Sequence, residues 1–248
     1  MIVLKSEDEI KRMAEAGRIV AEVLEGIRKI ITPGMKTKEI DEFAESFIRS
    51  KGAKPAFKGY RGYPSSVCTS INEQVVHGIP SPAKLRNGDI ISLDIGVKYR
   101  GFFGDAAVTL PVGTIGKEAE RLVNVTEQSL QAGIEQAVAG NRISVISASI
   151  QRCAETEGFS VVRTFVGHGI GRELHEEPQI PNYGRPGEGP EIRVGMTLAI
   201  EPMVNAGGWE VSILNDGWTA VTKDRKLSAH FEHTVAITKN GQEILTKI

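Results

Sequence analysis

Four acidic residues interrupt otherwise apolar, strand-like runs of this chain. They are Asp94 in SLDIG, Asp105 in FFGDAAV, Glu201 in LAIEPM and Glu232 in HFEHTV. An unpaired, ionised carboxylate inside an apolar strand lowers the stability of the fold by several kcal/mol, unless it takes up a proton and becomes neutral. The nearest basic residues, Lys98 and Arg100, lie at an expected turn. Four carboxylates with too few cations therefore predict a metal centre.

The first two acids are expected to face each other across a hairpin. Alternation along 90–97 places Ser92 and Asp94 on one face of a strand. With the turn at Tyr99 and Arg100, Asp94 would lie directly opposite Asp105, with Cβ atoms about 5 Å apart. Two carboxylates at that separation repel each other unless a cation lies between them. A solvent-facing pair on an edge hairpin is the structural alternative.

The two halves of the chain resemble diverged copies of one unit. Gly88 precedes Asp94 by six positions, and Gly195 precedes Glu201 by the same interval. Further along each copy, a second acid opens another apolar stretch. If a pseudo-twofold axis relates the copies, all four acids meet at one central place.

Histidines supply the candidate neutral ligands and acid–base groups. His168 lies in VGHGIG, where three glycines within five positions indicate close backbone approach. Imidazole is a common metal ligand and titrates near pH 7, so His168 is a candidate ligand, with a structural histidine as the alternative. His175 and His77 are candidate catalytic or supporting imidazoles. His230 and His233 flank the last of the acids and are expected on the opposite strand face, in structural roles.

The composition is that of an ordinary globular chain. Its 248 residues are 40% hydrophobic and 25% charged, with a net charge of -1, which gives no overall electrostatic reason to expect nucleic-acid or membrane binding. No run suits a signal peptide or a membrane span, so a cytoplasmic location is expected. Cys68 and Cys153 form no CxxC pair and are expected to be reduced thiols.

Helices and strands are predicted in blocks. A capping box at Ser6 and Glu9 begins a helix that ends near Pro33, and further helices are expected at 37–52, 117–138 and 144–157. Strands are predicted at 65–71, 74–77, 90–97, 102–110, 159–166, 196–204, 209–213, 218–221 and 231–238, with a surface loop at 181–190. Blocks without strict alternation favour an α+β fold with antiparallel sheets over a doubly wound parallel sheet.

Taken together, these stretches resemble the type I bacterial methionine aminopeptidases. The matches are PAFKGYRGYP (55–64), INEQVVHGIP (71–80), LDIGVKYRGFFGDAAVT (93–109), VGHGIGRELHEEPQIPNYG (166–184), GMTLAIEPM (195–203), DGWTAVT (216–222) and SAHFEHTVAIT (228–238). The resemblance implies an α+β pita-bread fold, with antiparallel sheets around a central metal site and helices packed outside. It also implies a single catalytic domain over 1–248, whose pseudo-twofold halves are roughly 1–110 and 111–248.

The resemblance further implies a site for two divalent ions, Co²⁺, Mn²⁺ or Fe²⁺, with Zn²⁺ and Ni²⁺ as further candidates. The implied ligands are Asp94, Asp105, His168, Glu201 and Glu232, of which Asp105 and Glu232 bridge the ions. The implied catalytic residues are His77, His175 and Glu201. The implied methionine pocket consists of Tyr60, Tyr63, Cys68, His77, His175 and Trp218, with Phe57 and Leu174 at positions where the chain departs from some relatives. A monovalent cation would bind the backbone of Asn72, Gln74 and Ser228.

The implied reaction removes the N-terminal methionine from nascent polypeptides with a small second residue, through a hydroxide that bridges the two ions. Glu201 would move the protons, His175 would stabilise the oxyanion and His77 would bind near the scissile bond. One alternative is a proline-directed aminopeptidase or prolidase, which would carry a large domain ahead of the catalytic one. Another is a non-catalytic pita-bread binding protein, which would have lost ligands. A monomer is expected, and transient ribosome docking through the basic residues of 5–12 is a further hypothesis.

Overall fold

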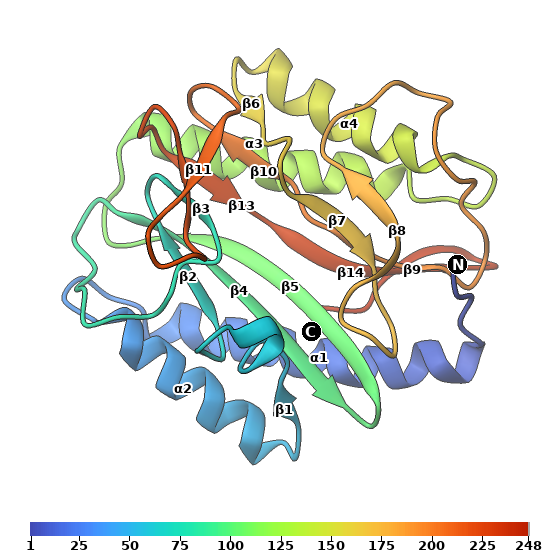
Figure 1. Ribbon diagram of the computed structural model, residues 1–248, viewed down its shortest axis with the longest axis horizontal. Coiled ribbons are helices and arrows are strands. Elements are labelled where there is room, and N and C mark those ends of the chain that lie inside the picture. Colours follow the sequence, from blue (N-terminus) through green and yellow to red (C-terminus); the bar gives the residue numbers. More distant parts are fainter. Residues whose placement is uncertain (248) are drawn as a thin grey trace.

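The computed structural model describes residues 1–247, in which helices lie outside antiparallel sheets (Figure 1). The helices are α1 (Glu7–Ile30), α2 (Thr37–Ser50), α3 (Lys117–Glu135) and α4 (Ile143–Thr156), with a 3₁₀ turn, η1, at Tyr60–Gly62. The strands are β1 (Lys54–Pro55), β2 (Cys68–Ile71), β3 (Gln74–Val76), β4 (Ile90–Tyr99), β5 (Phe102–Pro111), β6 (Ser160–Val161), β7 (Val166–Gly169), β8 (Glu176–Pro181), β9 (Thr197–Ile200), β10 (Met203–Asn205), β11 (Val211–Ile213), β12 (Ala220–Thr222), β13 (Ser228–His230), β14 (Glu232–Thr238) and β15 (Gly241–Ile244). Their pairing is antiparallel throughout the described residues, in agreement with the predicted α+β class.

Helix α1 begins at the predicted capping box. The Ser6 hydroxyl accepts a hydrogen bond from the Glu9 N–H, and the Glu9 carboxylate accepts one from the Ser6 N–H. The helix then crosses β5 closely, since a Cβ on Gly104 would lie only 2.8 Å from the Gly17 nitrogen. This approach lets α1 cover the hairpin that carries two of the four acids.

A nine-stranded sheet takes strands from both halves of the chain. At its centre β4, β5, β14 and β9 lie in that order, so β14 and β9 mirror β5 and β4 across the β5–β14 pair. Gly88 and Gly195 precede β4 and β9 and have φ values of 99° and 93°, a conformation that suits glycine. The expected internal repeat is therefore visible in the turns as well as in the strands.

Each half has its own apolar core. α1 and α2 cover β4 and β5 through side chains such as Ile27, Ile40 and Ile91, whereas α3 and α4 cover the other half through side chains such as Leu122 and Ile146. In Figure 1 the two helix pairs lie at opposite edges, with the strands between them.

No helix within residues 1–247 combines the length and apolar character that crossing a bilayer requires.

Several predicted strands differ from those in the structure. The run 159–166 is interrupted between β6 and β7, and the run 196–204 is interrupted between β9 and β10. The second interruption falls at Glu201 and Pro202, where proline has no N–H for a sheet hydrogen bond. Strands β1, β8, β13 and β15 have no predicted counterpart, and α3 ends at Glu135 instead of at 138.

The predicted register of the β4–β5 hairpin is wrong. Arg100 and Gly101 form the two-residue turn, both with positive φ (47° and 85°), a turn geometry that matches the twist of the flanking strands. Asp94 therefore lies opposite Ala107, not opposite Asp105. Because the shift is two residues, the two acids stay on one face as diagonal neighbours.

Candidate metal centre

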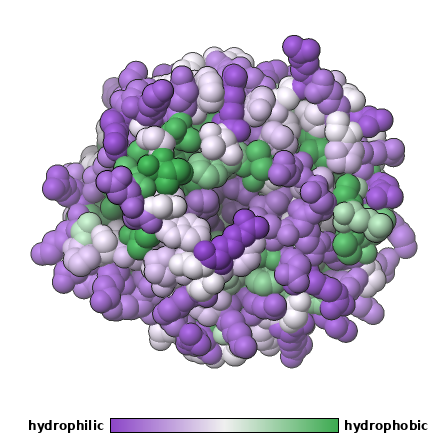
Figure 2. Space-filling model, in the orientation of Figure 1, coloured by the Kyte–Doolittle hydropathy of each residue, from purple (hydrophilic) through white to green (hydrophobic). Residues whose placement is uncertain are grey.

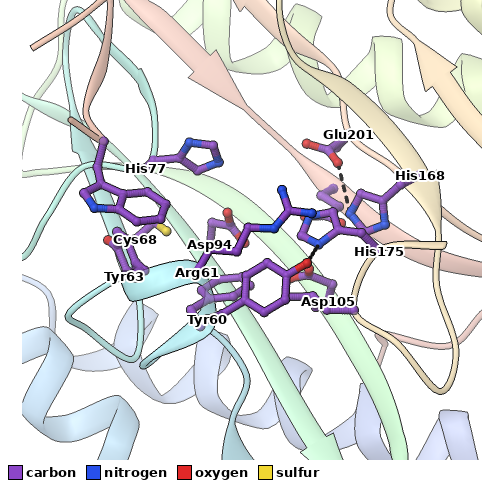
Figure 3. A pocket seen from close by; sticks show the side chains of 14 residues that line it. Tyr60, Arg61, Tyr63, Cys68, His77, Asp94, Asp105, His168, His175 and Glu201 are labelled. Carbon is purple, nitrogen blue, oxygen red and sulfur yellow. Dashed lines mark hydrogen bonds and ion pairs between the residues drawn. The ribbon is translucent and has the colours of Figure 1, made fainter.

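One cavity of ≈ 150 Å³ is lined by every residue predicted for the divalent ions, the catalytic groups and the methionine pocket (Figure 3). Its lining consists of Phe57, Tyr60, Arg61, Tyr63, Cys68, His77, Asp94, Asp105, His168, Leu174, His175, Glu201, Trp218 and Glu232. In Figure 3 Tyr63, Cys68 and His77 lie on one side and His168, His175 and Glu201 on the other. Figure 2 shows a hollow near the middle of the same face of the molecule.

The four acids reach this cavity from the two mirrored strand pairs. Asp94 lies on β4, Asp105 on β5, Glu201 directly after β9 and Glu232 at the start of β14. Among residues 1–247, no lysine or arginine nitrogen lies within 4.0 Å of these carboxylates, and only histidine nitrogens come that close. One buried carboxylate oxygen each of Asp94, Asp105 and Glu232 has no hydrogen-bond partner.

This donor set fits a metal centre. Asp105, His168 and Glu232 offer ligand atoms that all lie within 4.8 Å of one another. Carboxylate oxygens with an imidazole nitrogen are ligands that divalent first-row metal ions accept. The partnerless oxygens of the buried acids would find their missing partner in such an ion.

Without a cation, burial raises the pKa of each of the four carboxyl groups. Burial raises the pKa of Asp94 to about 7. Burial is also the main cause of the raised pKa of Asp105, to which the charges of Asp94 and Glu201 add. The pKa values of Glu201 and Glu232 are raised for the same reasons, burial first and neighbouring acids second. A bound divalent cation would favour the ionised forms instead.

His168 is oriented so that Nε2 reaches the cavity. Its Nδ1 lies 2.8 Å from the Gly169 carbonyl oxygen, so the Nδ1–H donates and Nε2 keeps its lone pair. Nε2 lies 3.4 Å from Glu201 Oε1. Burial lowers the pKa of His168 to about 4, so the ring is neutral near pH 7, as a metal ligand must be.

The glycines around His168 give β7 the close backbone approach that the sequence predicts. A Cβ on Gly167 would lie 2.5 Å from the Ala199 carbonyl oxygen, and a Cβ on Gly169 would lie 2.2 Å from the Glu177 carbonyl oxygen. Both obstacles are backbone atoms of the neighbouring strands β9 and β8. The position of His168 therefore depends on these glycines.

Gly169→Ala is expected to lower the free energy of unfolding by about 1–3 kcal/mol, because the added methyl group must push β7 and β8 apart. Calorimetry of the metal-free proteins would measure the loss. Gly184→Ala is the matched control, since the nearest atom to its Cβ is the Ser147 Cβ at 3.4 Å, an ordinary contact. Equal melting temperatures for the two variants would contradict tight packing at β7.

His175 is oriented through Tyr60. Its Nδ1 lies 2.9 Å from the Tyr60 hydroxyl, and the two rings stack with centroids 5.3 Å apart. When that hydroxyl donates to Nδ1, the proton of the neutral imidazole lies on Nε2 and can be donated to a ligand. Burial, helped by the nearby His168 and Arg61, lowers the pKa of His175 to about 3 and keeps the ring neutral.

A buried ion pair anchors the loop that leads to His175. Lys5 pairs with Glu176, and the Lys5 side chain is only 2% exposed. The Glu176 carboxylate also accepts hydrogen bonds from the N–H groups of Arg172 and Glu173. Lys5 therefore does not belong to the solvated basic face expected over 5–12.

His77 enters the cavity from the end of β3 in an unusual backbone conformation. Its φ is 61°, in the left-handed region that few non-glycine residues adopt, and its ring meets Phe165 edge-on at 5.3 Å. Burial lowers the pKa of His77. Strained residues cluster at functional sites, so the conformation of His77 is a reason to test the catalytic role that stays a prediction.

The other predicted pocket residues form an apolar wall. The Tyr63 hydroxyl donates a hydrogen bond of 2.9 Å to a backbone carbonyl, and its ring meets Trp218 at 5.2 Å. Gly96 leaves room for Phe57, whose ring would lie 2.6 Å from a Cβ at that position. Cys68 is buried, and burial raises the pKa of its thiol, so it contributes a protonated, weakly polar surface.

His230 reaches the site although the sequence predicts a structural role. Residues two apart on a strand share a face, so alternation itself puts His230 on the side of Glu232, and only His233 is expected on the opposite face. The buried Nε2 of His230 has no hydrogen-bond partner and lies 3.7 Å from Glu201 Oε2. His233 agrees with the prediction, since its Nδ1 lies 2.8 Å from the Thr246 hydroxyl.

Arg61 is the one cavity residue that sequence reasoning missed. It lies between Tyr60 and Tyr63, both predicted pocket residues, and a basic side chain between them is the signal that identifies it.

Two of the residues predicted to bind a monovalent cation, Asn72 and Ser228, are in direct contact, since the Asn72 carbonyl oxygen accepts a 2.9 Å hydrogen bond from the Ser228 N–H. A cation there stays a prediction.

The comparisons with known proteins agree on one family. The model of metallopeptidase family M24 matches residues 11–239. A methionine aminopeptidase of Clostridium perfringens is 55% identical over 248 residues, which cover 100% of both chains. The crystal structure of a methionine aminopeptidase from Thermotoga maritima matches with a TM-score of 0.98 and 50% identity over 100% of both chains. A prolidase from Pyrococcus furiosus shares the fold, with a TM-score of 0.80 and 23% identity over 99% of this chain and 66% of that chain. These matches confirm the predicted pita-bread fold.

Proposed function

Because this chain belongs to metallopeptidase family M24, we infer that it is a methionine aminopeptidase of the bacterial type I, a hydrolase that removes the N-terminal methionine from polypeptides. One observation carries this assignment: a single cavity in which four carboxylates, those of Asp105 and Glu232 buried, and three imidazoles face an apolar wall. Full-length identity to a methionine aminopeptidase supports it and favours it over a proline-directed peptidase, for which the likeness concerns the fold alone.

We propose that Asp94, Asp105, His168, Glu201 and Glu232 hold two divalent ions, with Asp105 and Glu232 shared between them. The partnerless buried oxygens and the compact Asp–His–Glu group support this proposal. One imidazole among many carboxylates suits Mn²⁺, Fe²⁺ or Co²⁺ better than a thiolate zinc site. When bound, such ions supply Lewis acidity, which polarises a carbonyl group and lowers the pKa of a water molecule.

The protein side chains then move protons and stabilise charge. Glu201 takes a proton from the attacking water and delivers it to the leaving amine. His175 donates through Nε2–H to the carbonyl oxygen of the substrate as negative charge develops there. His77 hydrogen-bonds at the scissile peptide group from the opposite side of the cavity.

The apolar wall binds the methionine side chain. A cavity of ≈ 150 Å³ accommodates one group of roughly benzene size, so a single side chain fills it. The second residue must then fit beside His77 and His175. We propose a preference for a small second residue, with each extra methylene costing about 1–3 kcal/mol where it is not accommodated.

Affinity for Mn²⁺ is expected to fall as the pH is lowered from about 8 to about 6. Without metal the pKa of Asp94 is about 7, so protons compete with the ion for its oxygens below that pH. Each proton displaced on binding changes the apparent affinity by about tenfold per pH unit. Titration calorimetry at several pH values, in buffers of different ionisation enthalpy, measures both the affinity and the protons released. Affinity that does not depend on pH would contradict the ligand assignment.

We propose that the chain acts as a single catalytic domain and as a monomer in the cytoplasm. The sheet shared by both halves supports one domain, and two unpaired cysteines suit a reducing compartment. Nascent polypeptides are the proposed substrates. Transient ribosome contact through the basic residues of 5–12 other than Lys5, and a monovalent cation at Asn72, Gln74 and Ser228, are further proposals.

Methionine release from a small peptide panel tests the assignment. The Mn²⁺-loaded protein is expected to cleave Met-Ala-Ser, to cleave Met-Leu-Ser far more slowly, and to leave Leu-Ala-Ser and Ala-Pro-Ser intact. Faster cleavage of the proline peptide would make the protein a proline-directed peptidase. Equal rates for the first two peptides would remove the proposed selection at the second residue.

A further inference from the structure

Among residues 1–247, Arg61 is the only lysine or arginine whose side chain lines the cavity. Residue 61 is exposed while its side chain borders the cavity, so it lies at the mouth. In Figure 3 its guanidinium group lies between His77 and His175. Within residues 1–247 it forms no ion pair, so its charge is available to a ligand.

Local structure holds Arg61 in this position. Its φ is 50°, and the neighbouring Gly59 and Gly62 also have positive φ, which together form the tight η1 turn. The guanidinium carbon lies 5.3 Å from the centre of the Tyr60 ring, and that ring carries the hydroxyl that orients His175. Arg61 and His77 both adopt a left-handed conformation and both line the cavity. Such strain at a site is a reason to look for function.

The path of a substrate brings its third residue to Arg61. The methionine side chain occupies the closed, apolar side of the cavity, so the chain beyond the scissile bond must leave through the mouth. Two residues of extended chain span roughly 7 Å, which places the third residue at the cavity rim. Four carboxylates would balance the charge of two divalent ions, which would leave the guanidinium of Arg61 as the uncompensated charge among the side chains that line the cavity. Figure 2 shows both strongly hydrophilic and hydrophobic side chains at the edge of this hollow.

We propose that Arg61 selects polypeptides with a carboxylate about two residues beyond the scissile bond. This inference rests on the proposed function and adds a substrate preference to it. The carboxylate is the side chain of an acidic third residue or the free terminus of a tripeptide. A guanidinium group pairs with either through two parallel hydrogen bonds. An ion pair at a partly exposed rim changes kcat/KM by about two- to fivefold. The change is expected mainly in KM, because the contact exists before and during the reaction.

Three amidated peptides measure this preference: Met-Ala-Asp-Leu-amide, Met-Ala-Asn-Leu-amide and Met-Ala-Lys-Leu-amide. The unmodified protein is expected to cleave the aspartate peptide about two- to fivefold more efficiently than the asparagine peptide. Arg61→Gln abolishes the difference, Arg61→Glu transfers it to the lysine peptide, and Arg61→Lys keeps it in weaker form. Arg12→Gln, an exposed arginine of α1 outside the cavity, is the matched control and keeps the preference.

A second pair of peptides, Met-Ala-Asn and its amide, separates the terminal carboxylate from the side chain. A preference for the free acid that disappears in Arg61→Gln assigns the terminal carboxylate to the same contact. Equal cleavage of all three amidated peptides, or a preference that survives in Arg61→Gln, would overturn the inference alone. Failure to cleave even the asparagine peptide with any divalent ion would overturn the proposed function, and this inference with it.

Discussion

Glu201→Gln is expected to lower kcat by about 10²–10⁴ while the protein stays folded. Glutamine keeps the size of the side chain and one oxygen atom, but it cannot take up a proton from water. His168 Nε2 and His230 Nε2 lie 3.4 Å and 3.7 Å from the two Glu201 oxygens, and a glutamine side chain of nearly the same shape fits the same space. Steady-state cleavage of Met-Ala-Ser at saturating Mn²⁺ measures the loss.

Glu201 is also a proposed ligand, so the metal content of Glu201→Gln must be measured beside its turnover. A variant that binds two ions and is inactive supports the proton-transfer role. An inactive variant that binds fewer ions supports ligation instead, and a fully active variant removes Glu201 from the mechanism. Glu118→Gln, an exposed position on α3, controls for the loss of one negative charge.

His175→Ala is expected to lower kcat by about 10²–10³ with a smaller change in KM, because the lost donor acts on charge that develops only during the reaction. Tyr60→Phe tests the orientation of that donor. The substitution keeps the stacked ring but removes the hydroxyl that lies 2.9 Å from His175 Nδ1, so the proton is no longer directed to Nε2. A smaller loss of kcat is expected than for His175→Ala.

The double variant with both substitutions completes this test. If Tyr60 acts only through His175, the double variant is no slower than His175→Ala alone. Tyr183→Phe removes a hydroxyl from an exposed tyrosine outside the cavity and is expected to be silent. Independent, additive losses for Tyr60 and His175 would contradict the orienting hydrogen bond.

The acids of the site were predictable from sequence because burial makes an unpaired carboxylate expensive. That argument needs only the apolar neighbours of Asp94, Asp105, Glu201 and Glu232, and it does not need the register of the strands. The register itself was not predictable, since a two-residue turn at either of two adjacent positions keeps both acids on one face. The left-handed conformation of Arg100 and Gly101 decides between them.

Sequence periodicity failed where regular structure is short. The assignment of His230 failed for a different reason: it was placed opposite Glu232, although residues two apart on a strand share a face. Strands of two to four residues, such as β13 and β15, carry too few side chains for a period to be visible. The start of α1 and the ends of α2 and α4 were predicted well because Ser6 and the glycines at 52 and 158 mark them, whereas α3 ends five residues before Gly140.

The most direct test of the central claim is a metal titration of the metal-free protein. At each metal concentration, the rate of methionine release from Met-Ala-Ser and the number of ions bound per chain are measured. Activity is expected to be absent without metal and to rise as Mn²⁺, Fe²⁺ or Co²⁺ fills the site, with about two ions per chain at saturation. The Asp105→Asn protein should require more metal to reach the same occupancy. Methionine release by the metal-free protein, or no release with any ion at full occupancy, would contradict the assignment of these buried carboxylates to a catalytic metal centre.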